Sequence, residues 1–206
     1  MSGRKLDRGD LPTVWAATAE VWRAWLEEYH TTAEGAWLHM YKKATGEPSI
    51  TWAEAVEQAL CFGWIDGQSK SIDERTFRQY FAPRKPGGTW SRKNKETVER
   101  LIAADLMHQR GLDAITVAKA NGAWERIDSV EAMEVPEDFA EALAANPAAA
   151  TYIETLSRSA RWQLLYWINA AKRPQTRADR IVQIIQAGNI GKRPDRFIQP
   201  KLGDAG

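Results

Sequence analysis

The sequence has one cysteine, three histidines and no long apolar run. With Cys61 alone an intramolecular disulfide is excluded, and a reducing compartment fits this usage. No stretch approaches 18 uninterrupted apolar residues, so we expect no membrane span. The basic start of the chain is not followed by the apolar segment of a secretory signal. We therefore expect a cytoplasmic protein.

The usual motifs of metal, nucleotide and hydrolytic sites are also missing. His30, His39 and His108 have no metal-ligand spacing, so we expect no metal. The chain has no phosphate-binding P-loop, no G-x-G-x-x-G and no G-x-S-x-G, so we expect no cofactor. Whether the protein is an enzyme stays open, and the lack of a complete catalytic motif favours that it is not.

The composition is that of a folded protein, with 44% hydrophobic and 27% charged residues among 206. Hydrophobic spacing predicts a mainly helical α+β fold. Residues 1–122 form a mixed part with a small antiparallel sheet or hairpin, and residues 123–206 form an all-helical part. We expect the two parts to pack as one compact unit.

Helices and strands can be placed along the chain from periodicity and capping signals. The expected strands are 35–43 and a hairpin within 64–81, in which Asp66-Gly67 resembles a turn. The expected helices are 14–30, 52–62 behind the capping box at Thr51, 92–102 capped by Ser91, 110–121, 136–143, one from Pro147, 158–171 and one capped by Thr176.

The net charge of +1 hides four blocks of alternating sign. Residues 1–69 hold six Lys or Arg against ten Asp or Glu, and residues 70–100 hold nine against four. Residues 101–171 hold five against ten, and residues 172–201 hold eight against two. The two basic blocks are either solvated faces or, if they meet, an anion-binding surface. We expect them to enclose a cleft.

The polar stretch from Trp64 to Asn94 is the main candidate site, since it combines arginines with aromatic residues. Arginine binds carboxylate or phosphate through two parallel hydrogen bonds. The alternative is a hairpin that carries charge to keep its edge soluble. The candidate ligand-binding residues are Trp64, Asp66, Arg75, Arg78, Arg84, Trp90, Ser91, Asn94, Lys172 and Arg177.

Three of these positions have a structural alternative. Asp66 is a turn residue or, as the candidate catalytic group, a general base. Lys172 and Arg177 lie where one helix ends and the next begins, where cations also stabilise the helix dipole. Cys61 lies in an apolar run, so we expect a buried core thiol rather than a nucleophile.

Two patterned stretches resemble the bacterial YdeI/OmpD-associated, or bacteriocin-protection, family. The first runs Glu57-x-x-Leu60-Cys61-Phe62-Gly63-Trp64-Ile65-Asp66-Gly67 and continues to Asn94; the second runs from Trp167 to Ile181. The resemblance extends from about residue 12 to about residue 187. It implies a role in stress or antimicrobial-peptide protection and transfers no catalytic residue.

Three functions follow from these observations. The first is a binding module for an anionic small molecule or an acidic peptide. The second is an enzyme that acts on a carboxylated or phosphorylated metabolite, with Asp66 as base and Arg84 as electrostatic stabiliser. The third is a weak nucleic-acid binder that uses the basic blocks and the interleaved aromatic residues.

Overall fold

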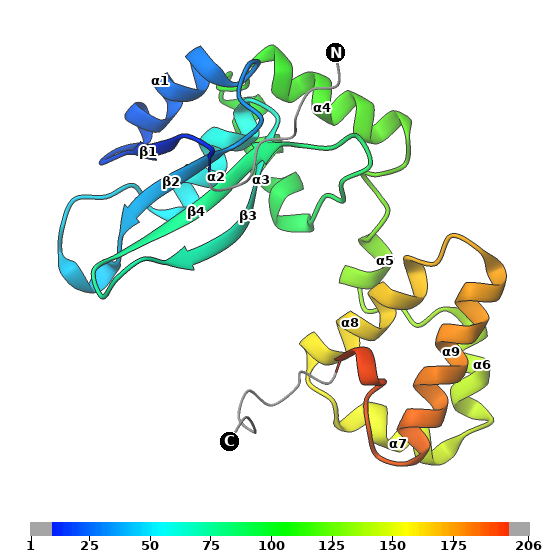
Figure 1. The fold of residues 1–206 in the computed structure, drawn as a ribbon. Helices are drawn as coiled ribbons and strands as arrows, with labels where there is room; N and C mark the ends of the chain where they lie inside the picture. Colours follow the sequence, from blue (N-terminus) through cyan, green and yellow to red (C-terminus); the bar gives the residue numbers. More distant parts are fainter. Residues whose placement is uncertain (1–9, 198–206) are drawn as a thin grey trace. The chain divides into compact units, whose positions relative to one another are not determined.

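The computed structural model describes residues 10–197, and these divide into two compact units. Unit 1 ends at Arg126 and unit 2 begins at Ile127. Gly122, after which we placed the boundary, lies in the turn of residues 121–127. Helix dominates, and the small sheet lies wholly in unit 1, so the predicted mainly helical α+β fold is confirmed (Figure 1).

Unit 1 consists of a sheet and its covering helices. Its elements are β1 (Thr13–Trp15), α1 (Ala19–Tyr29), β2 (Ala36–Tyr41), the 3-10 turn η1 (Lys43–Thr45), α2 (Trp52–Cys61), β3 (Trp64–Ser71), β4 (Thr76–Pro83), α3 (Arg92–Ala103) and α4 (Gln109–Ala120). The strand order is β1-β2-β4-β3. β1 pairs parallel to β2, whereas the other pairs are antiparallel.

The first strand corrects the predicted helix over residues 14–30. Residues 13–15 are extended, and the helix begins only at Ala19. The β-branched Thr13 and Val14 favour a strand, and the half-exposed Trp15 stacks on the His39 ring of β2 at 3.5 Å between centroids. Aromatic spacing alone therefore extended the predicted helix too far.

The predicted hairpin is confirmed, but its turn is not at Asp66-Gly67. Both residues lie within β3, at a shift of register against β4. The turn forms around Asp73, whose Oδ1 accepts hydrogen bonds from the backbone of Arg75 at 2.8 Å and of Thr76 at 2.6 Å. Gly67 is needed for space, because a Cβ there would lie 2.9 Å from the Tyr80 ring.

Helix α2 confirms the predicted capping box. Thr51 and Glu54 exchange side-chain to backbone hydrogen bonds at its start. Its apolar side is buried against the sheet and includes Cys61, which is fully buried as expected. Burial raises the pKa of the Cys61 thiol. Trp22, Leu26, Leu38 and Phe81 belong to the same core cluster.

Unit 2 is helical in its described part, as predicted. Its elements are α5 (Asp128–Glu131), α6 (Glu137–Ala144), α7 (Pro147–Thr155), α8 (Arg158–Asn169), α9 (Pro174–Asn189) and the 3-10 turn η2 (Asp195–Phe197). Its core includes Phe139, Ile153, Leu164 and Ile184. Thr176 is not a cap, because α9 already starts at Pro174, whose fixed φ suits the first helical position.

Within residues 10–197 no helix is both long enough and apolar enough to cross a membrane.

Candidate functional site

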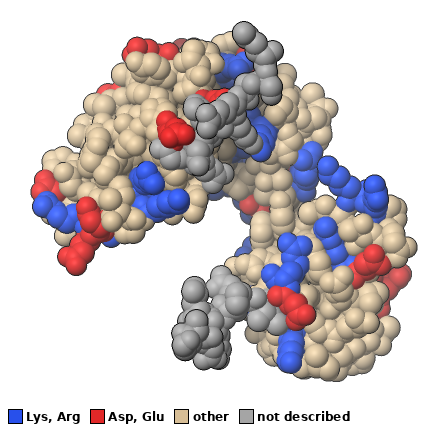
Figure 2. Space-filling model, in the orientation of Figure 1, with Lys and Arg blue, Asp and Glu red and all other residues tan. Residues whose placement is uncertain are grey.

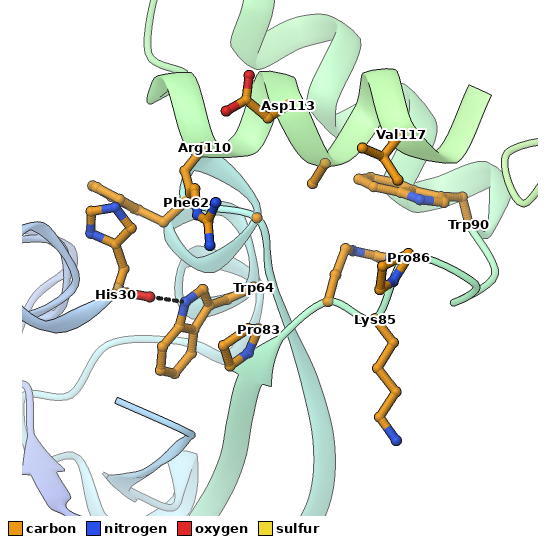
Figure 3. Close-up of a pocket in the computed structure, with 13 residues that line it drawn as sticks. His30, Phe62, Trp64, Pro83, Lys85, Pro86, Trp90, Arg110, Asp113 and Val117 are labelled. Atoms are coloured by element: carbon orange, nitrogen blue, oxygen red, sulfur yellow. Dashed lines mark hydrogen bonds between the residues drawn. The ribbon is translucent and has the colours of Figure 1, made fainter. Parts of the chain in front are cut away.

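Unit 1 contains a pocket of about 200 Å³ between the end of β4, the turn from α2 to β3, and α4. Phe62, Gly63 and Trp64 line one side, and residues 83–86 with Trp90 line another. Figure 3 shows Arg110, Asp113 and Val117 on α4, across from the segment that carries Pro83 and Pro86.

The pocket depends on a close approach of α4 to the turn after α2. Gly63 has φ +71°, and a Cβ on it would lie 2.9 Å from the backbone oxygen of Arg110. A Cβ on Gly111 would lie 2.3 Å from the oxygen of Cys61. Two glycines therefore allow the backbones to touch, and no larger residue fits either position without a shift.

The loop after β4 is fixed at several points. The backbone N–H of Arg84 donates to Gly63 O at 2.9 Å, and Gly88 N–H donates to Lys85 O at 2.8 Å. From the end of unit 1, Asn121 Nδ2 donates to Pro86 O at 2.8 Å and Arg126 Nη1 donates to Gly87 O at 2.7 Å. The pocket wall is therefore held by two backbone and two side-chain hydrogen bonds rather than by a regular element.

Arg84 is the chemically unusual residue of this wall. Its guanidinium lies 3.7 Å from the centre of the Trp90 ring, and Nη1 donates to Thr89 O at 3.1 Å. Its Nε and Nη2 are buried and have no hydrogen-bond partner. Burial lowers the pKa of Arg84 to about 10, and the Asp66 carboxylate opposes this shift. The side chain is thus a buried cation with two unsatisfied donors.

The charge around Arg84 is mostly positive. Lys85 and Arg110 line the pocket with exposed side chains, and Asp113 is the one acidic residue on its wall. Asp113 accepts a hydrogen bond from Gln109 Nε2 at 2.8 Å. Arg84 forms no ion pair within the described part of the chain, so no carboxylate among residues 10–126 neutralises it directly.

The structure brings three of the predicted site residues together at this pocket: Trp64, Arg84 and Trp90. The two tryptophans are almost fully buried, at 1% and 2% exposure, so they form the pocket wall rather than an open stacking surface. Trp64 Nε1 donates to His30 O at 3.2 Å, which fixes its ring (Figure 3).

The other predicted residues of unit 1 lie outside the pocket lining. Asp66 accepts a hydrogen bond from Trp52 Nε1 at 3.2 Å. Arg75 pairs with Glu47 at 2.6 Å, and Arg78 covers the Trp37 ring at 4.3 Å. Ser91 caps α3 by accepting from the backbone N–H of Asn94 at 3.3 Å, as predicted.

Lys172 and Arg177 belong to unit 2. Arg177 donates to both carboxylate oxygens of Asp138, at 2.6 and 2.9 Å, and joins α9 to α6. This pairing lowers the pKa of Asp138. Lys172 is exposed just after α8. Figure 2 shows Lys and Arg interspersed with Asp and Glu on the visible face of each unit.

Sequence reasoning did not select Arg110 and His30 for the site. Arg110 reaches the pocket because Gly111 beside it allows α4 to approach α2, and that glycine is the one local signal. The rings of His30 and His108 lie 4.7 Å apart although the residues are distant in sequence. In residues 10–197 no group of three or more His, Cys, Asp or Glu residues could hold a metal ion.

Comparisons with known proteins relate the two units to two different families. Residues 132–187 match the family described as bacteriocin-protection, YdeI or OmpD-associated. Residues 14–114 match a domain of unknown function, DUF8412. This stretch includes the pattern from Glu57 to Asn94, which in the sequence resembles the YdeI/OmpD-associated family. No curated protein and no solved structure matches the chain. The segment of unit 2 from residue 132 to residue 187 is therefore similar to the YdeI/OmpD-associated family.

Proposed function

We propose that this protein is a binding module for a small anionic molecule, held by Arg84 in the pocket of unit 1. The observation that carries the proposal is the pair of buried, unpartnered donors on the Arg84 guanidinium. A buried charge normally has a partner, because desolvation without one is costly. A bound anion would supply that partner.

The free donors favour a particular ligand chemistry. Nε and Nη2 lie on one edge of the guanidinium and can donate two parallel hydrogen bonds to a carboxylate or a phosphate. The Trp90 ring and the bond to Thr89 O hold the plane of the group in place. The plane of the guanidinium is therefore fixed before an anion binds.

The size and charge of the pocket further restrict the class of ligand that it could bind. At about 200 Å³ it is smaller than the pockets that bury drug-sized ligands. Lys85 and Arg110 add positive charge at the rim and would raise the local concentration of anions. A small mono- or dicarboxylate or a phosphate fits better than a polymer.

An enzymatic role has less support, because Asp66 does not line this pocket and is engaged by Trp52. A general base needs to reach the bound substrate directly or through one water molecule. The pocket as it stands supports binding more than turnover.

The test is calorimetric titration of the full chain with acetate, succinate, inorganic phosphate and an acidic peptide in chloride buffer. We expect one class of small anion to bind at a 1:1 ratio, with at least tenfold weaker binding in Arg84→Met. The control Lys43→Met removes an exposed charge of the same unit outside the pocket and should leave the affinity unchanged. Equal affinity in wild type and Arg84→Met would overturn the proposal. Binding of the acidic peptide alone would reassign the pocket to a protein partner.

A further inference from the structure

Unit 2 has a larger pocket of different chemistry. It encloses about 540 Å³ between α6, α7 and α8. Its floor consists of buried apolar side chains from all three helices, among them Phe139, Ile153, Leu164 and Leu165. Its volume lies in the range of small-molecule sites. All of its lining residues lie within residues 132–187, the segment that matches the family.

The charges at this pocket are few and lie at its rim. Arg158 and Arg161 come from α8 and Glu154 comes from α7, and all three are exposed. Arg158 Nη2 donates to Glu131 O at 3.0 Å, which anchors it over the pocket. The Arg161 guanidinium forms no hydrogen bond or ion pair within residues 10–197. The rim is thus positive by one charge and has an uncommitted guanidinium.

The backbone conformation of Met133 supports a role for its side chain in ligand binding at the edge of the pocket. Met133, which lines the pocket, has φ +61°, a left-handed conformation that favours glycine. It lies just after α5, and its N–H donates to Val130 O at 3.0 Å. Glycine would fit this position without strain but would supply no apolar wall. The chain has instead a flexible apolar side chain here, of the kind that adapts to irregular ligands.

We propose that the pocket of unit 2 binds a single-chain amphiphile with an anionic head group. The alkyl chain lies over Phe139, Ile153 and Leu164, and the head group pairs with Arg161 beside Arg158. Apolar burial supplies the affinity and the arginines select the charge. This inference rests on unit 2 alone and is independent of the anion site at Arg84.

The first experiment compares head groups on one chain length in the full protein. Dodecanoate and dodecyl phosphate are the anionic probes, dodecanol is neutral and dodecyltrimethylammonium is cationic, each below its micelle concentration. We expect 1:1 binding with affinity in the order anionic, neutral, cationic. A preference for dodecanoate indicates a fatty acid, and one for dodecyl phosphate indicates a phospholipid-type ligand. Equal affinity for all head groups would overturn the proposal.

Two variants locate the site. Arg161→Gln should weaken dodecanoate binding about tenfold, the effect of one charge-assisted hydrogen bond, and leave dodecanol binding unchanged. Arg173→Gln removes an exposed arginine of the same unit outside the pocket and is its control. Ala140→Trp fills the rim from an exposed position of α6 and should abolish binding of both ligands. Ala178→Trp, at an exposed position of α9, is the matched control.

Chain length gives a separate test. Each added methylene group should increase affinity by about fourfold, from about 0.8 kcal/mol per buried CH₂, until the pocket is full. Affinity that continues to rise up to the longest soluble chain would indicate surface association and contradict a bounded site. Sedimentation of wild type and Ala140→Trp measures the oligomeric state of each. If wild type is a dimer that this variant dissociates, the pocket is an interface between copies and the proposal is wrong.

Discussion

Replacement of Arg84 by methionine should make the protein more stable while it removes anion binding. Methionine keeps much of the length of the side chain and can pack on the Trp90 ring, but it brings no charge into the pocket wall. Most substitutions of partly buried residues destabilise a protein. A gain here would show that Arg84 is retained for a purpose other than folding.

The expected gain follows from the pKa of Arg84. Burial lowers it from the ordinary value of an arginine to about 10, and each pH unit of this difference corresponds to about 1.36 kcal/mol. Because the folded pKa is the lower one, the charged form is disfavoured by folding, and this penalty of about 3 kcal/mol is fully present below pH 10. It fades only as the pH rises toward the unfolded value.

Two favourable contacts are lost in the same substitution. The cation–π contact with Trp90 contributes about 1 kcal/mol, and loss of the donor to Thr89 O costs about another. The net gain at pH 7 is therefore about 1 kcal/mol. For a chain of this size, such a gain raises the thermal midpoint by about 2–4 °C.

Urea unfolding at pH 7, followed by tryptophan fluorescence in chloride buffer, measures this difference directly. Added phosphate should stabilise the wild type and leave the free energy of unfolding of Arg84→Met unchanged, because only the wild type gains a partner for its cation. A loss of 2 kcal/mol or more in Arg84→Met would refute the reasoning. It would mean that the guanidinium already has favourable interactions in the folded protein and does not need an anion as a partner.

Three further predictions test the framework of the two units. Gly63→Ala should destabilise unit 1 by about 2 kcal/mol, measured by urea unfolding, because it combines a left-handed backbone with a clash against Arg110 O; an unchanged midpoint would contradict the close approach of α4. Cys61 should resist iodoacetamide at pH 8 until denaturant is added, as judged by mass spectrometry, since burial raises its pKa; equal labelling of the native protein would refute its burial. Asp138→Asn should cost up to about 1 kcal/mol at pH 7, because Asp138 is half-exposed. The hydrogen bond from Arg177 lowers its pKa from 3.8, so this stabilisation is present above pH 3.8 and is lost as the pH falls through the lowered pKa. A difference from wild type that stays constant in strong acid would argue against the pair with Arg177.

The sequence correctly predicted the features that depend only on residues close together in the chain. The capping box at Thr51 and the cap at Ser91 each depend on residues within three positions, and both are present. The hairpin was visible from its alternation, but its turn was misplaced. Asp-Gly is a common turn pair, yet here the Asp73 side chain forms the turn and Gly67 makes room for Tyr80, a neighbour across the sheet.

The candidate site could be predicted only in part, for the same reason. Arg84, Trp64 and Trp90 could be selected because charge and aromatic residues gather in one stretch of sequence. Whether an arginine is satisfied depends on its partners in space, and Arg75, Arg78 and Arg84 look alike in the sequence. Arg75 pairs with Glu47 and Arg78 covers Trp37.

Arg84 alone among these three has buried donors without a partner, and on this property rests our proposal that it binds a ligand. The same test applies to two arginines of unit 2. Arg177 is committed to Asp138, whereas Arg161, which no charge pattern singled out, is uncommitted beside an apolar pocket. The clustering of charge along a chain therefore indicates a candidate region. Which of its cations is available to a ligand depends on the hydrogen bonds and ion pairs that each guanidinium forms in the folded protein.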